Sequence, residues 1–182
     1  MEPILILKKY YPEGSQAYDR MLTHCLSVAY KALAIVEAHP ELVVDKIFVY
    51  EAALLHDIGA FLTNAPSIGC HGEHPYIEHG RLGAELMRRE GFEKHARVCE
   101  RHTGTGISLP EGDFFPETVE EKLICYADTF FSKTRLDEEK TVEQVKTQLA
   151  KYGEDSVARF EEMHKLFKCH CGLDPQSHED EN

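Results

Sequence analysis

The chain has 182 residues, of which 42% are hydrophobic and 29% are charged, so we expect one ordinary globular domain with a sizeable core. Its formal net charge of −12 argues against a protein that wraps duplex nucleic acid, because binding to phosphates needs a basic surface. Neither a run of about 18 apolar residues nor a basic leader with a cleavage site is found, so we expect no membrane span, no signal peptide and a cytoplasmic location.

The first predicted elements lie on either side of Pro12 and Pro40. Residues 4–10 are expected to form a short helix or an extended arm. Ser15 is a candidate N-cap for a long helix that ends near Ala38, and Asp45 is a candidate N-cap for the next one. This second helix is expected to end at about Ile58, with Gly59 in the left-handed conformation that often follows a helix.

The rest of the chain also predicts helices, which gives an all-α, single-domain bundle of about six or seven helices over residues 1–168. Residues 62–75 lack apolar periodicity and are expected to form a loop. Thr118-Val-Glu-Glu is a capping box at the start of a helix. The other helices are expected at about 76–89, 92–102, 141–152 and 155–167.

Six cysteines occur, at positions 25, 70, 99, 125, 169 and 171. The first four stand among apolar residues and are expected to be free core thiols in a reducing compartment. Cys169-His170-Cys171 could hold a stray metal, but it is too short for a zinc finger. It belongs to residues 169–182, which are predicted to be a disordered acidic tail.

The helix that ends in His56 and Asp57 is apolar on nearly every side, so it should lie inside the core. An ionised Asp57 would need a compensating charge there, and a metal ion beside an imidazole would supply one. Other residues able to bind metal occur about once per predicted helix, which would let the helices build one shared centre. These residues are His24, His79, His102 and Asp128.

Each of these residues also has a structural alternative. His56 and Asp57 could instead be a His–Asp pair at a helix end. His24 and Asp128 could be a buried hydrogen-bonded pair, and His79 and His102 could be surface histidines. Four further residues are candidates for contact with a substrate, with ordinary loop or helix-end positions as the alternative: His71, His74, Arg101 and Lys133.

The order His, His-Asp, His, His, Asp resembles that of the HD-domain metal-dependent phosphohydrolases, with His56-Asp-Ile-Gly59 present in full. The resemblance covers residues 20–135 and includes His24-Cys-Leu-Ser-Val-Ala, His79-Gly and Tyr126-Ala-Asp. Cys99-Glu-Arg-His-Thr-Gly-Thr-Gly and Tyr126-Ala-Asp-Thr-Phe-Phe-Ser-Lys look like the small stand-alone bacterial HDIG-type proteins.

The resemblance implies one or two divalent ions, such as Fe, Mn, Zn, Ni, Co or Mg, which mixed imidazole and carboxylate ligands suit. It implies that Asp57 bridges two sites, one completed by His24, His56 and Asp128 and the other by His79 and His102. Two such ions can lower the pKa of a bridging water. The implied function is therefore hydrolysis of a phosphomonoester or phosphoanhydride in a small, nucleotide-like substrate, with Asp57 as the catalytic residue.

Some positions depart from the branch of this family that acts on cyclic dinucleotides. Ala60 stands where that branch has lysine, Arg101-His102 stands where it has paired histidines, and its Gly-Tyr-Pro signature is missing. Activity on cyclic dinucleotides is therefore not expected. Two other functions are considered, a non-catalytic module that binds metal or nucleotide and a di-iron oxygenase on the same fold. The expected partner is a small phosphorylated substrate, and neither duplex nucleic acid nor a membrane is expected.

Overall fold

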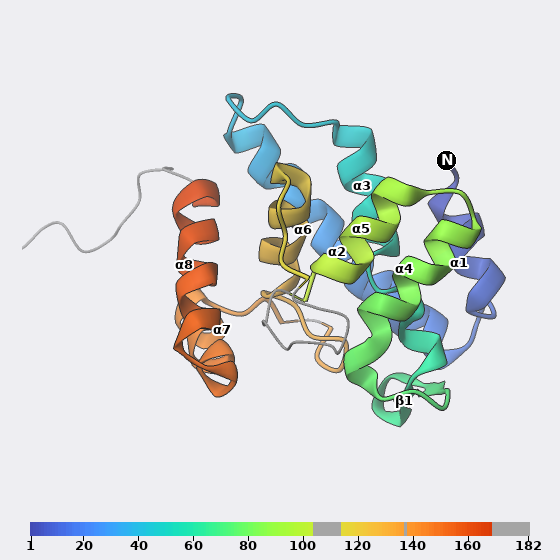
Figure 1. Cartoon of the computed structure of the whole chain (residues 1–182). Helices are drawn as coiled ribbons and strands as arrows, with labels where there is room; N and C mark the ends of the chain where they lie inside the picture. Colours follow the sequence, from blue (N-terminus) through green and yellow to red (C-terminus); the bar gives the residue numbers. More distant parts are fainter. Residues whose placement is uncertain (104–113, 137, 169–182) are drawn as a thin grey trace, which may run out of the picture.

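A computed structural model describes residues 1–103, 114–136 and 138–168 of the chain. These residues form eight α-helices and one short two-stranded sheet (Figure 1). The predicted all-α class is confirmed, with eight α-helices in place of six or seven. The predicted disordered tail, including Cys169-His170-Cys171, lies outside the described residues.

The elements follow the chain in a simple order. The α-helices are α1 (Pro3–Tyr10), α2 (Gln16–Ala38), α3 (Lys46–Leu55), α4 (His79–Arg89), α5 (Glu93–Arg101), α6 (Val119–Asp128), α7 (Val142–Leu149) and α8 (Glu154–Phe167). Short 3-10 helices are η1 (Ile58–Leu62), η2 (Pro66–Ile68), η3 (Tyr76–Glu78) and η4 (Ala150–Tyr152). The predicted loop 62–75 contains η2 and the antiparallel strands β1 (Asn64–Ala65) and β2 (Cys70–His71).

Local hydrogen bonds explain where the principal helices begin. The Ser15 side chain accepts a hydrogen bond from the backbone N–H of Tyr18, and the Asp45 carboxylate accepts from the first turn of α3. At the start of α6, Thr118 and Glu121 form a complete capping box. The three helix starts predicted from these caps are confirmed.

The end of α3 differs from the prediction. The helix stops at Leu55, and η1 follows after a turn at His56 and Asp57. Gly59 does not have a positive φ, so the prediction of a left-handed conformation was wrong. A Cβ atom at Gly59 would lie 2.2 Å from the carbonyl oxygen of His79 and 2.3 Å from the nitrogen of Gly83. Glycine is therefore required here because η1 packs directly against the backbone of α4.

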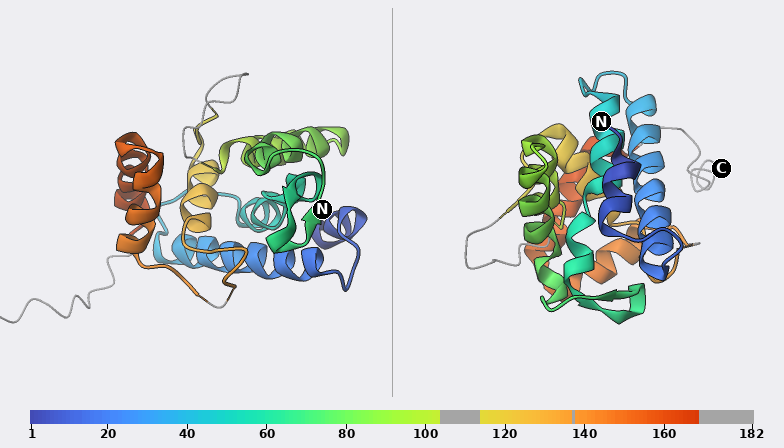
Figure 2. Two further views of the ribbon diagram at one scale, coloured as in Figure 1. Left: turned by 90° about the horizontal axis from the view of Figure 1, so that it is seen from below. Right: turned by 90° about the vertical axis from the view of Figure 1, so that its right-hand side faces the viewer.

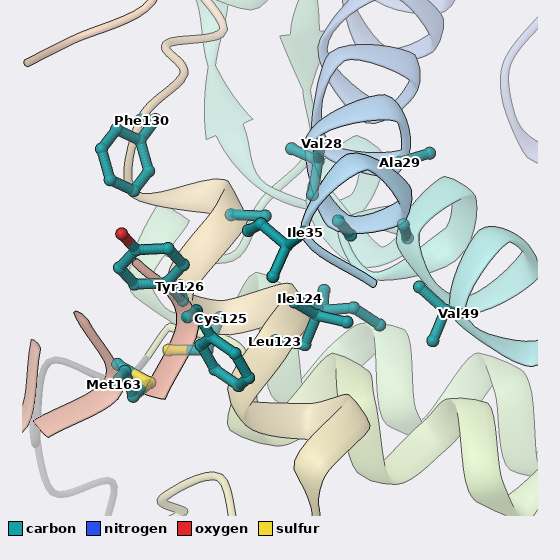
Figure 3. Packing of buried hydrophobic residues seen from close by; sticks show 14 of the residues in the cluster. Val28, Ala29, Ile35, Val49, Leu123, Ile124, Cys125, Tyr126, Phe130 and Met163 are labelled. Atoms are coloured by element: carbon teal, nitrogen blue, oxygen red, sulfur yellow. The ribbon is translucent and has the colours of Figure 1, made fainter. Parts of the chain in front are cut away.

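Two apolar clusters form the core. One joins the carboxyl-terminal part of α2 to α3, α6, α7 and α8, and Figure 3 shows Ile124 of α6 packed between Ile35 and Val49. The other joins α1, η1, α4 and α5 to the beginning of α2 and the end of α3. In Figure 2 the long helix α2 runs along the molecule, with α1 at one end and the α7–α8 pair at the other. Thus α2 connects the two clusters.

Helix α2 is also the one helix in the described part of the chain that is long and apolar enough to cross a membrane. Its mean hydropathy reaches only 1.2 in the best window, and 44% of that window is buried inside the protein. Core residues such as Cys25, Val28 and Ala32 supply this apolar character. Because a core helix passes the same test, α2 is not a convincing membrane span.

Candidate metal centre

Six side chains from different parts of the fold meet between α2, α4 and α6. Five of them are buried, and Asp128 has a side chain that is 19% exposed. They are His24 in α2, His56 and Asp57 after α3, His79 at the start of α4, His102 after α5 and Asp128 at the end of α6. The structure therefore brings together all six residues that the sequence analysis named as metal ligands.

Asp57 stands at the middle of this centre, and its two carboxylate oxygens face different partners. Oδ2 lies 3.1 Å from Nε2 of both His24 and His56. Oδ1 lies 3.2 Å from Nε2 of His79 and 3.3 Å from Nε2 of His102. The carboxylate is therefore shared between two groups of histidines.

Asp128 completes the first group. Its Oδ1 atom lies 2.9 Å from Nε2 of His24 and 3.4 Å from Nε2 of His56. Within each group the potential ligand atoms all lie within 4.8 Å of one another, so each set could surround one ion. The two groups correspond to the two sites that the resemblance implied, and this His/Asp cluster suits divalent metal binding.

Backbone hydrogen bonds orient three of the histidine rings. In each case Nδ1 faces the carbonyl oxygen three residues earlier, at 2.6–2.7 Å: His56 to Ala53, His79 to Tyr76 and His102 to Cys99. A carbonyl oxygen can only accept, so Nδ1 carries the hydrogen and Nε2 of the neutral ring keeps its lone pair. This arrangement fixes the tautomer that binds a metal through Nε2.

The second group shows why a cation fits. Nε2 of His79 and Nε2 of His102 lie only 3.1 Å apart, and both also face Oδ1 of Asp57. Three electron-rich atoms this close repel one another unless a proton or a cation lies between them. Burial lowers the pKa of His102, which disfavours the proton. The donor set is therefore better satisfied by a metal ion.

The first group leads to the same conclusion. Both oxygens of Asp57 and the Nε2 atoms of His24 and His56 are buried, and none has a hydrogen-bond partner with good geometry among the described residues. Lys133 brings its Nζ atom to 2.6 Å from Oδ2 of Asp57 and neutralises part of the charge, while the Asp57 carboxylate outweighs desolvation and raises the pKa of His56 well above its usual range. Buried polar atoms without partners are costly, and coordination would remove that cost.

The electrostatics keep both carboxylates ionised. Burial disfavours the charged form of Asp57, but Lys133 and His56 outweigh it and hold the pKa of Asp57 well below its usual range. Asp128 behaves in the same way, since Lys133 and His24 overcome its desolvation and lower its pKa. Burial also opposes the charge of Lys133, yet Asp57 raises the pKa of the ammonium. The centre thus presents anionic oxygen ligands at neutral pH.

A cavity of about 220 Å³ opens beside the centre. Its described lining includes Tyr76, His79, His102, Asp128, Lys133 and Lys140. Of the four predicted substrate contacts, Lys133 lies here and the other three do not. His71 and His74 are exposed around the β1–β2 hairpin, and Arg101 is held by the Phe115 carbonyl and Glu117.

Lys140 was missed by the sequence analysis. Its Nζ atom donates hydrogen bonds to the carbonyl oxygens of Thr129 and Phe131, at 3.0 and 3.2 Å, in the segment that follows α6. Burial lowers its pKa, although the charge of Asp128 opposes this effect. No local pattern indicates this position, because the contact depends on how the chain folds back after α6.

Four buried cysteines give a test of the core. Cys25, Cys70, Cys99 and Cys125 are free, as predicted, and burial raises the pKa of Cys70 to about 11. Only the thiolate reacts with iodoacetamide, so Cys70 at pH 8 should react roughly 100-fold more slowly in the native protein than in urea. Its native rate should rise about tenfold per pH unit up to about pH 11, whereas the unfolded rate should level off near pH 9. Peptide mass spectrometry measures each site, and equal rates at pH 8 would contradict the buried position.

Residues 21–133 match the family model of the HD domain. The chain belongs to the HD-domain family. It is 30% identical to a tRNA (cytidine(56)-2'-O)-methyltransferase from Picrophilus torridus, over 92% of this chain and 50% of that protein. It is 31% identical to the same-named protein from Thermoplasma volcanium, over 87% of this chain and 45% of that protein.

A third relative, an uncharacterized protein from Methanocaldococcus jannaschii, is 36% identical over 73% of this chain and 79% of its own length. No solved structure shows significant similarity. The chain spans about half the length of the two methyltransferases that it matches.

These relatives correct the predicted function. The sequence resemblance implied a phosphohydrolase, but the curated relatives whose names state an activity are tRNA methyltransferases. The HD family is confirmed, whereas the narrower placement among bacterial HDIG-type proteins is not, and the relatives given above are archaeal. The physical reason is that a ligand set fixes which ions can bind, while the surrounding pocket and partner units decide the reaction.

Proposed function

We propose that this HD domain acts in the 2'-O-methylation of tRNA as a divalent-metal-binding unit. The observation that carries the proposal is the similarity to the Picrophilus torridus methyltransferase over 92% of the chain. Because the match covers only 50% of that enzyme, we assign methyl transfer itself to a further unit and a supporting role to this domain.

The charge of the chain supports this division of roles. A net charge of −12 disfavours binding to a polyanion such as tRNA, so the main RNA contacts would come from the further unit. The absence of duplex nucleic acid as a direct partner stays a prediction. A small phosphorylated ligand also stays a prediction, with Lys133 and Lys140 as the cations that would meet its phosphate.

The centre would hold one or two divalent ions. His24, His56, Asp57 and Asp128 would bind one ion, and Asp57, His79 and His102 would bind the other. Nitrogen and oxygen ligands together suit first-row ions such as iron, manganese, cobalt, nickel and zinc. When bound, the ions supply a concentrated positive charge that attracts an anionic oxygen ligand into the cavity. A cytoplasmic location stays a prediction.

The proposal is tested by deleting the gene in its source organism and measuring 2'-O-methylcytidine at tRNA position 56 by mass spectrometry. We expect the modification to fall, and to return with the wild-type gene but not with Asp57→Asn, because that variant loses the shared ligand. The control is Glu13→Gln, which makes the same kind of change at an exposed residue. Unchanged methylation in the deletion strain would contradict the proposed function.

A further inference from the structure

Tyr11 lies outside the residues that match the HD family, yet it contacts the metal centre. It follows α1 directly, and its side chain is buried with 1% exposed. The family match begins only at residue 21. The ring packs edge-on against Phe61 of η1, with the ring centroids 5.6 Å apart.

The hydroxyl group of Tyr11 is bonded into the turn that carries Asp57. It accepts a hydrogen bond from the backbone N–H of Phe61 at 2.9 Å. It donates toward the carbonyl oxygen of Ile58 at 3.2 Å, with the carbonyl oxygen of Asp57 at 3.5 Å alongside. One buried hydroxyl therefore bonds to two points of η1, at Ile58 and at Phe61, directly after the turn at His56 and Asp57.

This turn controls where the shared ligand points. The backbone of Asp57 has φ −102° and ψ 9°, close to the values of the third residue in a type I turn. Two hydrogen bonds fix this turn. The Ala60 N–H donates to the Asp57 carbonyl oxygen within the same segment, and the Tyr11 hydroxyl donates to the Ile58 carbonyl oxygen from another part of the chain.

We propose that Tyr11 is a positioning residue of the metal centre, which orients Asp57 through the backbone of the turn. The inference rests on the proposed metal binding. It extends the functional unit beyond the family-matched residues, because Tyr11 directly follows α1 and lies before residue 21. Buried partners left without Tyr11 would lose their hydrogen bonds, and the turn would relax away from the geometry that both ligand groups share.

The chain offers a matched control in the neighbouring Tyr10. Its ring stacks on the same Phe61, with centroids 5.3 Å apart, but its hydroxyl donates to Glu90 on the surface of the protein. Tyr10→Phe and Tyr11→Phe thus remove the same atom from adjacent residues and keep both rings. Only the second removes a contact to the turn of Asp57.

The experiment titrates metal-free wild-type protein and both variants with Co²⁺ and follows the visible absorption of the bound ion. Loss of a group that orients a ligand typically costs 10- to 100-fold in metal affinity, so Tyr11→Phe should bind Co²⁺ about 10-fold more weakly or worse. Tyr10→Phe should bind as the wild type does. Circular dichroism at the same temperature establishes that each variant is folded.

The outcomes separate this inference from the proposed function. Wild-type affinity in Tyr11→Phe would overturn the role of Tyr11 and leave metal binding intact. Failure of the wild-type protein to bind Co²⁺ would overturn both.

A second measurement needs no variant. Because coupling between two sites is reciprocal, Zn²⁺ binding should slow hydrogen exchange of the Phe61 amide in the wild-type protein. Exchange that is unchanged by bound Zn²⁺ would overturn the role of Tyr11.

Discussion

Replacing Asp57 with asparagine is expected to abolish binding at both proposed metal sites, whereas replacing Asp128 with asparagine is expected to weaken binding at only one of them. Asp57 gives one oxygen to each group, but Asp128 faces only His24 and His56. An amide is a neutral and weaker ligand, and even groups that only orient a ligand account for 10- to 100-fold in affinity, so we expect a loss of more than about 100-fold for Asp57→Asn.

Metal content per chain, measured by plasma mass spectrometry after dialysis, distinguishes the two variants. Asp19→Asn is the control, since it makes the same change at an exposed position of α2, the helix that carries His24. If Asp57→Asn kept one ion at wild-type affinity, the carboxylate would not be shared between the two sites.

Gly59→Ala is expected to produce a large loss of stability for a single added methyl group. The new Cβ atom would lie 2.2 and 2.3 Å from backbone atoms of α4, which cannot rotate away as a side chain can. Helix α4 and η1 must then separate, and overpacking of this kind costs about 3 kcal/mol or more. Urea denaturation monitored by circular dichroism measures the change in the free energy of unfolding.

Gly83→Ala is the matched control for this prediction. Its Cβ atom would lie 3.1 Å from the Gly59 nitrogen and 3.4 Å from the Cys99 side chain, so small shifts can accommodate it. Alanine also favours a helix over glycine by up to about 1 kcal/mol, which offsets part of the cost. Equal stability of Gly59→Ala and the wild-type protein would show that η1 and α4 do not pack as described.

The beginnings of the principal helices follow from the sequence because the groups that fix them are close in the chain. Ser15, Asp45 and Thr118 each bond to backbone N–H groups within three residues. The end of α3 is different. Gly59 lies directly against the backbone of Gly83 in α4. A pattern of neighbouring residues cannot reveal this contact, because the two glycines are distant in the chain.

The metal centre was more accessible to sequence analysis than the cavity beside it. His56 and Asp57 stand out because charged or polar groups in an apolar helix need a reason. Arg101, a predicted substrate contact, is not among the described residues that line the cavity, and its guanidinium bonds to the Phe115 carbonyl oxygen and Glu117. The predicted function was wrong because the six ligands resemble those of phosphohydrolases, and the spacing of ligands does not determine which reaction a domain serves.

The contact between Lys133 and Asp57 has a consequence for how the centre is loaded. Many small metal sites consist of ligands that repel one another until the ion arrives, so that folding waits for the metal. Here an ammonium group belonging to the chain stands 2.6 Å from the shared carboxylate, and it also faces the Tyr76 ring at 5.8 Å. Lys133 therefore already compensates part of the charge that an ion bound by Asp57 would neutralise, so the fold of this turn would not have to wait for a metal.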